Sequence, residues 1–263
     1  MQLQGRRVLI TGASRGIGRA LAKAFAGAEA KVALVARSEG PLHELASELG
    51  GTAHAADLLD PEQVATLLHR VEDAGGPVDV LVNNAGIGTP GAFMEHTAGE
   101  VEATIRLNLT TPLELCRQAV PRMSRRGSGH LVTVGSLAAV AYVPGMVTYA
   151  ATKAGVVHFS EALRDELRGL PINVTTVLVG PVLTDLLAEG ETYRPLHAGF
   201  QRLRWTQLLP DTDADALAAA VVAGVEGDRK VVFLPKRAAP FVAAAWFPRR
   251  FIERWLVGVP RRA

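Results

Sequence analysis

The chain has 263 residues, of which 48% are hydrophobic, and it is therefore long enough to bury a full core. Its net charge of +2 is unevenly spread, because residues 229–263 hold nine Lys/Arg and one acid, Glu253. These basic residues are interleaved with apolar aromatics and follow no recognition motif, so nucleic-acid binding is not expected. The single cysteine, Cys116, excludes an internal disulfide and fits a small core residue in a reducing compartment.

The first residues and the histidines argue against two further classes of protein. The opening "MQLQGRRVLITG" enters a strand pattern at once, which leaves no room for the apolar core of a signal peptide or for a spanning helix. We therefore expect a cytoplasmic protein. The seven histidines have no paired metal-ligand spacing, and no metal site is expected.

Apolar β-type runs alternate with helical patterns along the chain. The expected strands lie at about 6–11, 31–37, 52–57, 78–86, 130–136, 172–181 and 230–235. The expected helices lie at about 18–28, 40–51, 61–75 and 100–126, around Tyr149, and at 213–226. Continuous apolar strands separated by helices predict a parallel sheet covered on both faces. The sequence thus predicts a single-domain, doubly wound α/β fold of the Rossmann-like type.

The first expected strand is followed by "TGASRGIG" (11–18), which spaces three glycines as GxxxGxG before a helix. Without Cβ atoms the loop can turn tightly, and a phosphate can approach the helix N-terminus, where unpaired N–H groups favour anions. A glycine triplet alone also fits turns and helix packing. Its place between a strand and a helix favours dinucleotide binding, and the missing Gly-Lys-Ser/Thr ending excludes a Walker loop.

The second expected strand ends at Arg37, near the position where an NAD site would carry an acid for the ribose hydroxyls. An arginine there suits a 2′-phosphate, and Arg15 in the glycine loop could add a second cation. We therefore predict NADP(H) in preference to NAD(H). The alternative is that Arg37 is solvated and Glu39 turns inward.

In "TYAATK", Tyr149 and Lys153 stand four residues apart, on one face of a helix. A phenol has a pKa of ~10 and becomes useful as an acid or base at neutral pH when an adjacent ammonium favours the phenolate. By itself the pair also fits an exposed tyrosine packed on a lysine stem.

Four further segments join these motifs: "NNAG" (83–86), Asn108 in "RLNLTTP", Ser136 in "VTVGS" and "GPVLT" (180–184). In content and order, the whole set resembles the short-chain dehydrogenase/reductase family over about residues 4–235. The resemblance implies an NADPH-dependent oxidoreductase that interconverts a carbonyl and a secondary alcohol. It covers the expected domain, 1–237, and leaves 238–263 as an extension.

The resemblance also implies a catalytic set. Tyr149 is expected to be the general acid for carbonyl reduction and the base for alcohol oxidation, with Lys153 lowering its pKa and binding the nicotinamide ribose. Ser136 is expected to hold the substrate oxygen, and Asn108 to hold a water that relays protons. This complete set disfavours the alternative of a nucleotide-binding regulatory or scaffold protein that senses NADPH without turnover.

The residues around Asn108 give a local reason for that water. Pro112 has no N–H, so the carbonyl of residue 108 loses its usual donor four residues on. A free, buried carbonyl needs a partner, and water is the simplest one. The alternative is a mere kink in the helix.

The resemblance implies a set of cofactor contacts as well. Asp57 is expected near the adenine, the backbone of 84–86 beneath the adenosine ribose, and Pro181 with Thr184 at the nicotinamide carboxamide. The set is Gly12, Ser14, Arg15, Gly16, Ile17, Gly18, Arg37, Asp57, Leu58, Asn84, Ala85, Gly86, Tyr149, Lys153, Pro181 and Thr184.

Residues 182–211 occupy the place of the family's substrate lid. Their many apolar side chains predict a small hydrophobic carbonyl or alcohol substrate, such as a ketone or an oxoacyl compound. Arg194, Arg202 and Arg204 could meet an anionic carrier such as a phosphopantetheine thioester, or could be ordinary solvated charges.

The extension, 238–263, interleaves aromatic residues with arginines, which suits a segment lying in a lipid interface. The equally weighted alternative is a helix packed on a sister subunit or over its own active site. The resemblance implies a homodimer or homotetramer, formed through the two long helices.

Overall fold

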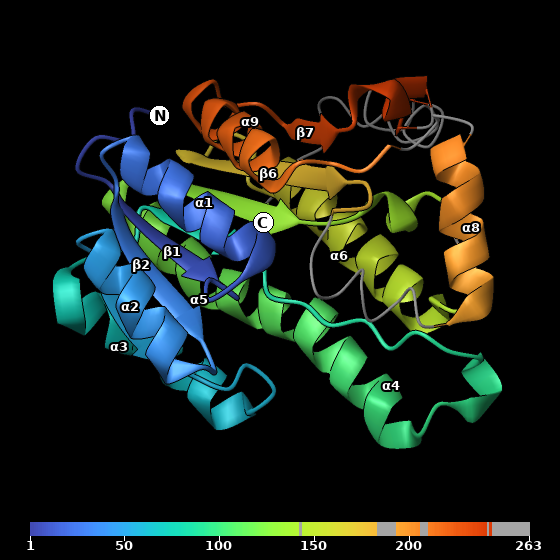
Figure 1. The fold of residues 1–263 in the computed structure, drawn as a ribbon. Helices are drawn as coiled ribbons and strands as arrows, with labels where there is room; N and C mark the ends of the chain where they lie inside the picture. Colours follow the sequence, from blue (N-terminus) through green and yellow to red (C-terminus); the bar gives the residue numbers. More distant parts are fainter. Residues whose placement is uncertain (142–143, 183–192, 206–209, 241, 244–263) are drawn as a thin grey trace.

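The computed structural model describes residues 1–141, 144–182, 193–205, 210–240 and 242–243. Its strands form one parallel sheet in the order β3-β2-β1-β4-β5-β6-β7 (Figure 1). The strands are β1 (Arg7–Thr11), β2 (Lys31–Ala36), β3 (Thr52–Ala55), β4 (Val80–Asn83), β5 (Gly129–Val134), β6 (Ile172–Val179) and β7 (Val231–Leu234). The predicted doubly wound α/β fold is confirmed.

Helices connect successive strands, as a parallel sheet requires. They are α1 (Gly16–Gly27), α2 (Glu39–Glu48), α3 (Pro61–Gly75), α4 (Ala98–Ile105), α5 (Thr111–Arg126), α6 (Val147–Glu166), α8 (Arg194–Trp205) and α9 (Ala214–Glu226). Short 3-10 turns lie at η1 (Phe93–Glu95), η3 (Leu137–Ala139) and η4 (Lys236–Ala238), and η2 (Arg106–Thr110) is a π-helical segment.

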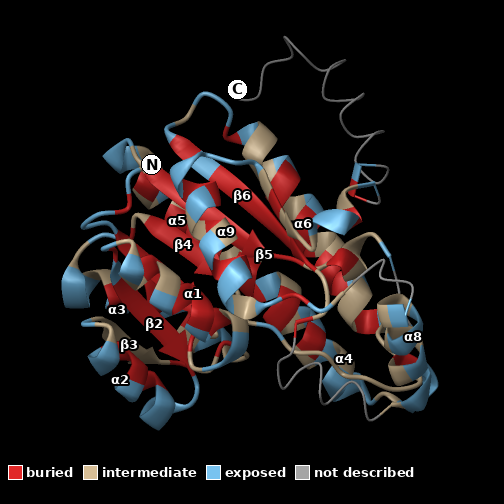
Figure 2. Ribbon diagram, turned by 45° about the horizontal axis from the view of Figure 1, so that its top comes forward, coloured by how far each residue is buried: buried red, intermediate tan, exposed pale blue. Residues whose placement is uncertain are grey.

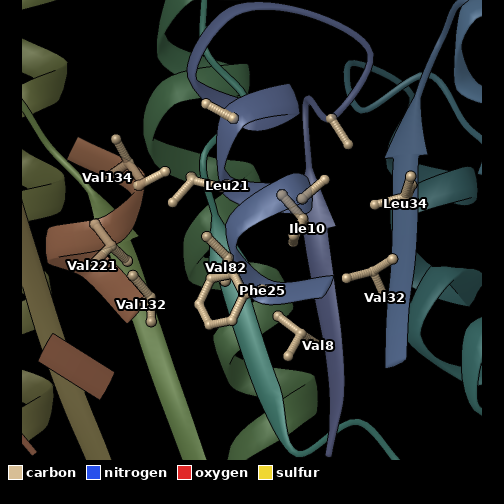
Figure 3. Packing of buried hydrophobic residues seen from close by; sticks show 14 of the residues in the cluster. Val8, Ile10, Leu21, Phe25, Val32, Leu34, Val82, Val132, Val134 and Val221 are labelled. Atoms are coloured by element: carbon tan, nitrogen blue, oxygen red, sulfur yellow. The ribbon is translucent and has the colours of Figure 1, made fainter. Parts of the chain in front are cut away.

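Side chains alternate along each strand and divide the core into two layers. On one face, Leu21 and Phe25 of α1 lie over β1 and β4, and Val221 of α9 lies beside Val132 and Val134 of β5 (Figure 3). On the other face, residues such as Leu9 and Leu81 pack against α3 and α5. Figure 2 shows the central strands buried, the edge strand β3 half-buried, and exposed residues on the outward surfaces of the helices.

Two segments differ from the sequence-based expectation. The predicted helix at 100–126 is divided into α4 and α5 by η2, because Pro112 has no N–H to offer to an α-helical register. The expected lid holds a regular helix, α8, whose amphipathic pattern was not predicted as an element of its own.

The beginning of the C-terminal extension belongs to the core of the domain. Ala238 is fully buried and Val242 is 5% exposed, and both pack with Leu137, Val157 and Leu178. Residues 241 and 244–263 lie outside the described residues, so the predicted lipid contact of the extension stays a prediction. Within the described ranges, no helix combines the length and apolarity needed to cross a bilayer.

Candidate active site

The strand order reverses between β1 and β4, and this is the point where ligands bind in open parallel sheets. The two strands are paired in register, Ile10 opposite Val82. The glycine loop leaves the end of β1, and the "NNAG" segment leaves the end of β4. The connections therefore diverge on opposite faces and leave a crevice at the carboxyl edge.

Glycine is required where these two segments touch. Gly12 has φ +67°, and a Cβ on it would lie 2.9 Å from the Cα of Ala85. A Cβ on Gly18 would collide with the carbonyl oxygen of Gly12 and lie 2.7 Å from Nδ2 of Asn84. The glycine loop thus packs backbone against backbone, which leaves room for a phosphate to approach.

A set of hydrogen bonds fixes that contact. The Oγ1 of Thr11 accepts the N–H groups of Asn84 at 3.0 Å and Ala85 at 3.1 Å, and donates to the carbonyl of Val82 at 3.3 Å. The Nδ2 of Asn84 donates to the carbonyls of Thr11 at 2.9 Å and Gly12 at 3.3 Å. Sequence analysis missed Thr11, although a hydroxyl residue directly before the glycine loop was the available signal.

The N-terminus of α1 is open to an anion. Its N-cap residue, Arg15, makes no side-chain cap hydrogen bond, and its first turn has no acidic residue. Side chains of Asp60, Thr97 and Asp213 cap α3, α4 and α9, whereas α2 and α6, like α1, have no side-chain cap. The first N–H groups of a helix have no partner within it, so the end of α1 suits a cofactor phosphate.

The other expected residues of the loop lie at the same place. Gly16 begins α1 with φ +53°, while Ser14 and Ile17 are half-buried beside it. Arg37 directly follows β2 and is exposed, as is Arg15. Both arginines thus lie just beyond the carboxyl ends of adjacent strands, β1 and β2, and their contact with a 2′-phosphate stays a prediction.

The residues after β3 are held by local bonds. The N–H of Asp57 donates to Oε1 of Gln63 at 2.9 Å, and its Oδ1 accepts the N–H of Leu59 at 3.0 Å. Leu58 is buried, and its carbonyl accepts the hydroxyl of Thr111 at 2.8 Å. These bonds fix the shape of the turn on which the predicted adenine contacts of residues 57 and 58 depend.

Ser136 and Tyr149 come together from the end of β5 and the first turn of α6. Ser136 caps η3, with its Oγ accepting the N–H of Ala138 at 3.1 Å. Burial raises the pKa of the Tyr149 hydroxyl above its ordinary value, and a hydrogen bond with the side chain of Ser136 lowers it in part. The phenol therefore keeps its proton at neutral pH.

Lys153 lies one turn further along α6 and is 5% exposed. Its Nζ donates to the carbonyl of Val134 at 3.0 Å and lies 5.6 Å from the centroid of the Tyr149 ring. Burial lowers the pKa of Lys153 to about 8. Burial outweighs the other effects on the Tyr149 hydroxyl in this structure, and the expectation that Lys153 favours the phenolate stays a prediction.

The side chain of Asn108 joins these residues to the loop after β4. Its Oδ1 accepts the N–H of Ile87 at 2.9 Å, and its Nδ2 donates to the carbonyl of Ile87 at 2.7 Å. A Cβ on Gly86 would lie 3.1 Å from that Oδ1 and 3.5 Å from Nζ of Lys153. The backbone of Asn108 lies in η2, and the water that it was expected to hold stays a prediction.

The two ends of the expected lid are in contact with each other. Val182 and Thr212 form a parallel bridge, and the N–H of Thr212 donates to the carbonyl of Pro181 at 2.6 Å. Thr184 lies outside the described residues. Before α8, the ring of Tyr193 packs on Gly145, where an added Cβ would lie 2.5 Å from Cδ1 of that ring. The lid helix thus adjoins the segment that leads into Tyr149.

Asn83 and Cys116 lie in the core behind the site. Asn83 donates from Nδ2 to Sγ of Cys116 at 3.3 Å, which ties β4 to α5. Burial raises the pKa of Cys116 to about 12, which fits a core thiol. Across the ranges that the structure describes, no group of three His, Cys, Asp or Glu side chains could hold a metal ion.

A family model described as short chain dehydrogenase matches residues 6–194. The chain belongs to this family. A ketoacyl reductase, HetN, from Nostoc sp. is 35% identical to this short-chain dehydrogenase over 225 residues, which cover 83% of this chain and 76% of HetN. A 3-oxoacyl-acyl-carrier-protein reductase, FabG, from Vibrio cholerae is 32% identical over 249 residues, covering 92% of this chain and 94% of FabG.

Solved structures agree with this assignment. A short-chain dehydrogenase from Sphingobium yanoikuyae, in complex with NADPH, superposes with a TM-score of 0.80 at 31% identity, covering 97% of this chain and 98% of that chain. The protein is thus an NAD(P)-dependent oxidoreductase. The glycine contact and the uncapped helix α1 are the features of this short-chain dehydrogenase that fit such a cofactor.

Replacing Gly18 by alanine is expected to weaken nucleotide binding. The added methyl group would force the glycine loop away from Asn84, and we expect the Kd for NADPH to rise about 10- to 100-fold. Fluorescence titration measures this Kd, with thermal melting as a check on folding. The matched control is Gly40→Ala, where a Cβ meets nothing within 4 Å and the Kd should stay unchanged. A folded Gly18→Ala protein that binds NADPH with wild-type affinity would contradict the binding of the nucleotide at the glycine loop.

The pKa of Lys153 predicts a basic limb in the pH profile of carbonyl reduction. Because burial lowers that pKa to about 8, the ammonium is present below this pH and is lost above it. We expect kcat/KM for reduction to be level up to this pH and then to fall. In Lys153→Arg the side chain stays charged, so the limb should vanish whatever activity remains. A wild-type profile that stays level well above this pH would refute the assignment.

Proposed function

We propose that this short-chain dehydrogenase reduces a hydrophobic ketone or oxoacyl carbonyl with NADPH, or catalyses the reverse oxidation. The observation that carries the proposal is the close approach of Ser136, Tyr149 and Lys153 to one another, with Lys153 next to Gly86, in the segment that packs on the glycine loop. A regulatory nucleotide sensor would not need a buried lysine beside a half-buried phenol, because burying a cation is unfavourable.

The residues have distinct roles in this proposal. When bound, NADPH supplies a hydride from C4 of its nicotinamide. The hydroxyl of Ser136 holds the substrate oxygen, and Tyr149 gives it a proton, for which a raised pKa keeps the phenol protonated. The ammonium of Lys153 then stabilises the phenolate that proton transfer leaves behind. Asn108 holds the water through which Tyr149 regains its proton from solvent.

The preference for NADP(H) is supported by Arg37 and Arg15. An exposed guanidinium directly after β2 suits a 2′-phosphate through charge-assisted hydrogen bonds. The NADPH complex of the Sphingobium short-chain dehydrogenase supports the same choice. Thr184 completes the cofactor contacts that we propose at the nicotinamide end, together with Pro181.

The substrate class is supported by the relatives and by α8. HetN is named a ketoacyl reductase and FabG a 3-oxoacyl-acyl-carrier-protein reductase, so an oxoacyl chain is the first candidate. Phe200 and Leu203 of α8 are half-buried, while Trp205 is 86% exposed. Arg204 is paired with Asp211 at 3.1 Å, which leaves the exposed Arg194 and Arg202 as the stronger candidates for an anionic carrier.

The assembly that we propose is a homodimer or homotetramer through the long helices, in the cytoplasm. Ile105, at the end of α4, is 41% exposed, and Val147, at the start of α6, is 53% exposed. An apolar side chain on each of these helices supports a subunit contact on that side of the molecule.

A change at Arg37 should separate the two cofactors. We expect Arg37→Ala to raise the Kd for NADPH about 10- to 100-fold, since charged hydrogen bonds are worth roughly 1.5–3 kcal/mol, and to leave the Kd for NADH nearly unchanged. Titration with both nucleotides measures this. Arg19→Ala removes an exposed arginine of α1 and serves as the control. Tighter binding of NADH than NADPH by the wild type would overturn the preference.

The activity itself is tested by following NADPH absorbance with ketones and oxoacyl thioesters of rising chain length. We expect turnover to increase with chain length, and kcat to fall by about 10²- to 10⁴-fold in Tyr149→Phe while NADPH still binds. Tyr193→Phe, which keeps the ring on Gly145, is the matched control and should keep its activity. Tight NADPH binding without turnover on any substrate of the panel would defeat the proposal.

A further inference from the structure

A buried hydroxyl lies between two residues of the active site. Thr152, on α6, is 2% exposed and immediately precedes Lys153. Its Oγ1 donates to the carbonyl of Tyr149 at 2.8 Å and is 3.2 Å from Nδ2 of Asn108. It is therefore the direct link between the helix that carries the phenol and the side chain of Asn108.

The direction of both hydrogen bonds follows from their partners. A carbonyl can only accept, so the hydroxyl hydrogen of Thr152 goes to Tyr149, and its oxygen is left to accept from Asn108. The second hydrogen on Nδ2 of Asn108 goes to the carbonyl of Ile87, and Oδ1 accepts the N–H of Ile87. If the amide of Asn108 were flipped, its NH₂ group would face the N–H of Ile87, and its oxygen would face the carbonyl of Ile87. Neither pair can form a hydrogen bond, so only one orientation fits.

A hydroxyl bonded to the carbonyl three residues earlier is common in helices, and alone it would mean little. The bond from Asn108 is what distinguishes Thr152, because it crosses to another element. A buried pair elsewhere on the same helix gives the contrast. Ser160 lies 2.9 Å from the hydroxyl of Thr176 on β6, and that pair involves no residue of the active site.

The link joins three segments that must stay in register. Ile87 follows the "NNAG" segment, Asn108 lies in η2, and Tyr149 and Lys153 lie on α6. Gly86, next to Ile87, approaches Lys153 so closely that an added Cβ would lie 3.5 Å from Nζ. A small shift of α6 against this loop would therefore move the phenol and the ammonium relative to the cofactor side of the site.

We propose that Thr152 is a positioning residue, whose hydroxyl couples the Asn108 amide to the turn of α6 that carries Tyr149. It touches no reacting atom and acts through the two residues that it bonds. The proposal rests on the proposed function only for its kinetic consequence, because the coupling itself also has a readout without turnover.

The kinetic experiment compares Thr152→Val, which keeps the shape and removes the hydroxyl, with Thr152→Ser, which restores it. We expect kcat for reduction to fall about 10-fold or more in Thr152→Val, with the KM for NADPH near the wild-type value, and to recover in Thr152→Ser. Thr176→Val makes the same change at the remote buried pair. It should lower the melting temperature and leave kcat unchanged.

The second experiment observes Tyr149 directly. The chain has three tyrosines, so tyrosine labelled with ¹³C at Cζ gives three resonances, and Tyr149→Phe assigns the one from Tyr149. We expect the shift and titration midpoint of this resonance to change in Thr152→Val and to return in Thr152→Ser. They should be unaffected in Thr176→Val.

The outcomes separate the coupling from the activity. An unchanged Tyr149 resonance in a folded Thr152→Val protein overturns the inference, as does a change of equal size in Thr176→Val. Failure of the serine variant to restore the resonance also overturns it. Absence of turnover in the wild type would defeat the proposed function alone, since the resonance still reports on the coupling.

Discussion

The contact between the glycine loop and the segment after β4 is the constraint on which the rest of the site depends. Thr11 makes it possible, since one hydroxyl accepts two successive backbone N–H groups of that segment. This contact brings Gly86 beside Lys153 and Ile87 beside Asn108. The glycine loop and the predicted catalytic residues are thus held by one continuous set of contacts to the backbone of residues 84–87.

Burial acts on Tyr149 and Lys153 in the same sense, although their pKa values move in opposite directions. A low-polarity environment disfavours the charged form of each, so it raises the pKa of the phenol and lowers that of the ammonium. Before any proton transfer, Tyr149 is therefore neutral, and Lys153 is the one charged group of this pair. In the mechanism that we propose, charges separate only on proton transfer, when the phenolate forms beside an ammonium that water screens little.

The sequence was sufficient to predict the features that depend on residues close together along the chain. Apolar strands, the glycine loop and the Tyr149/Lys153 spacing are local patterns, and the fold and the family were predicted from them. Thr11 and Thr152 were missed, because a hydroxyl gains its role from partners 73 and 44 residues away in the pairs Thr11–Asn84 and Asn108–Thr152. The sequence showed that Pro112 would remove a helical hydrogen bond, but not that the chain would respond with the π-helical segment η2. It also gave no sign that burial would raise the pKa of Tyr149.

The bridge between Val182 and Thr212 has a consequence for how this protein can change over time. It joins the two ends of the segment that was predicted to be the substrate lid, so that this segment leaves the domain and returns to it at one point. The entropic cost of closing such a loop grows slowly with its length, by roughly 0.6 kcal/mol of free energy for each doubling. If this segment selects the substrate, as predicted, insertions and deletions between Val182 and Thr212 can change the substrate at a small cost in stability, without altering the glycine loop.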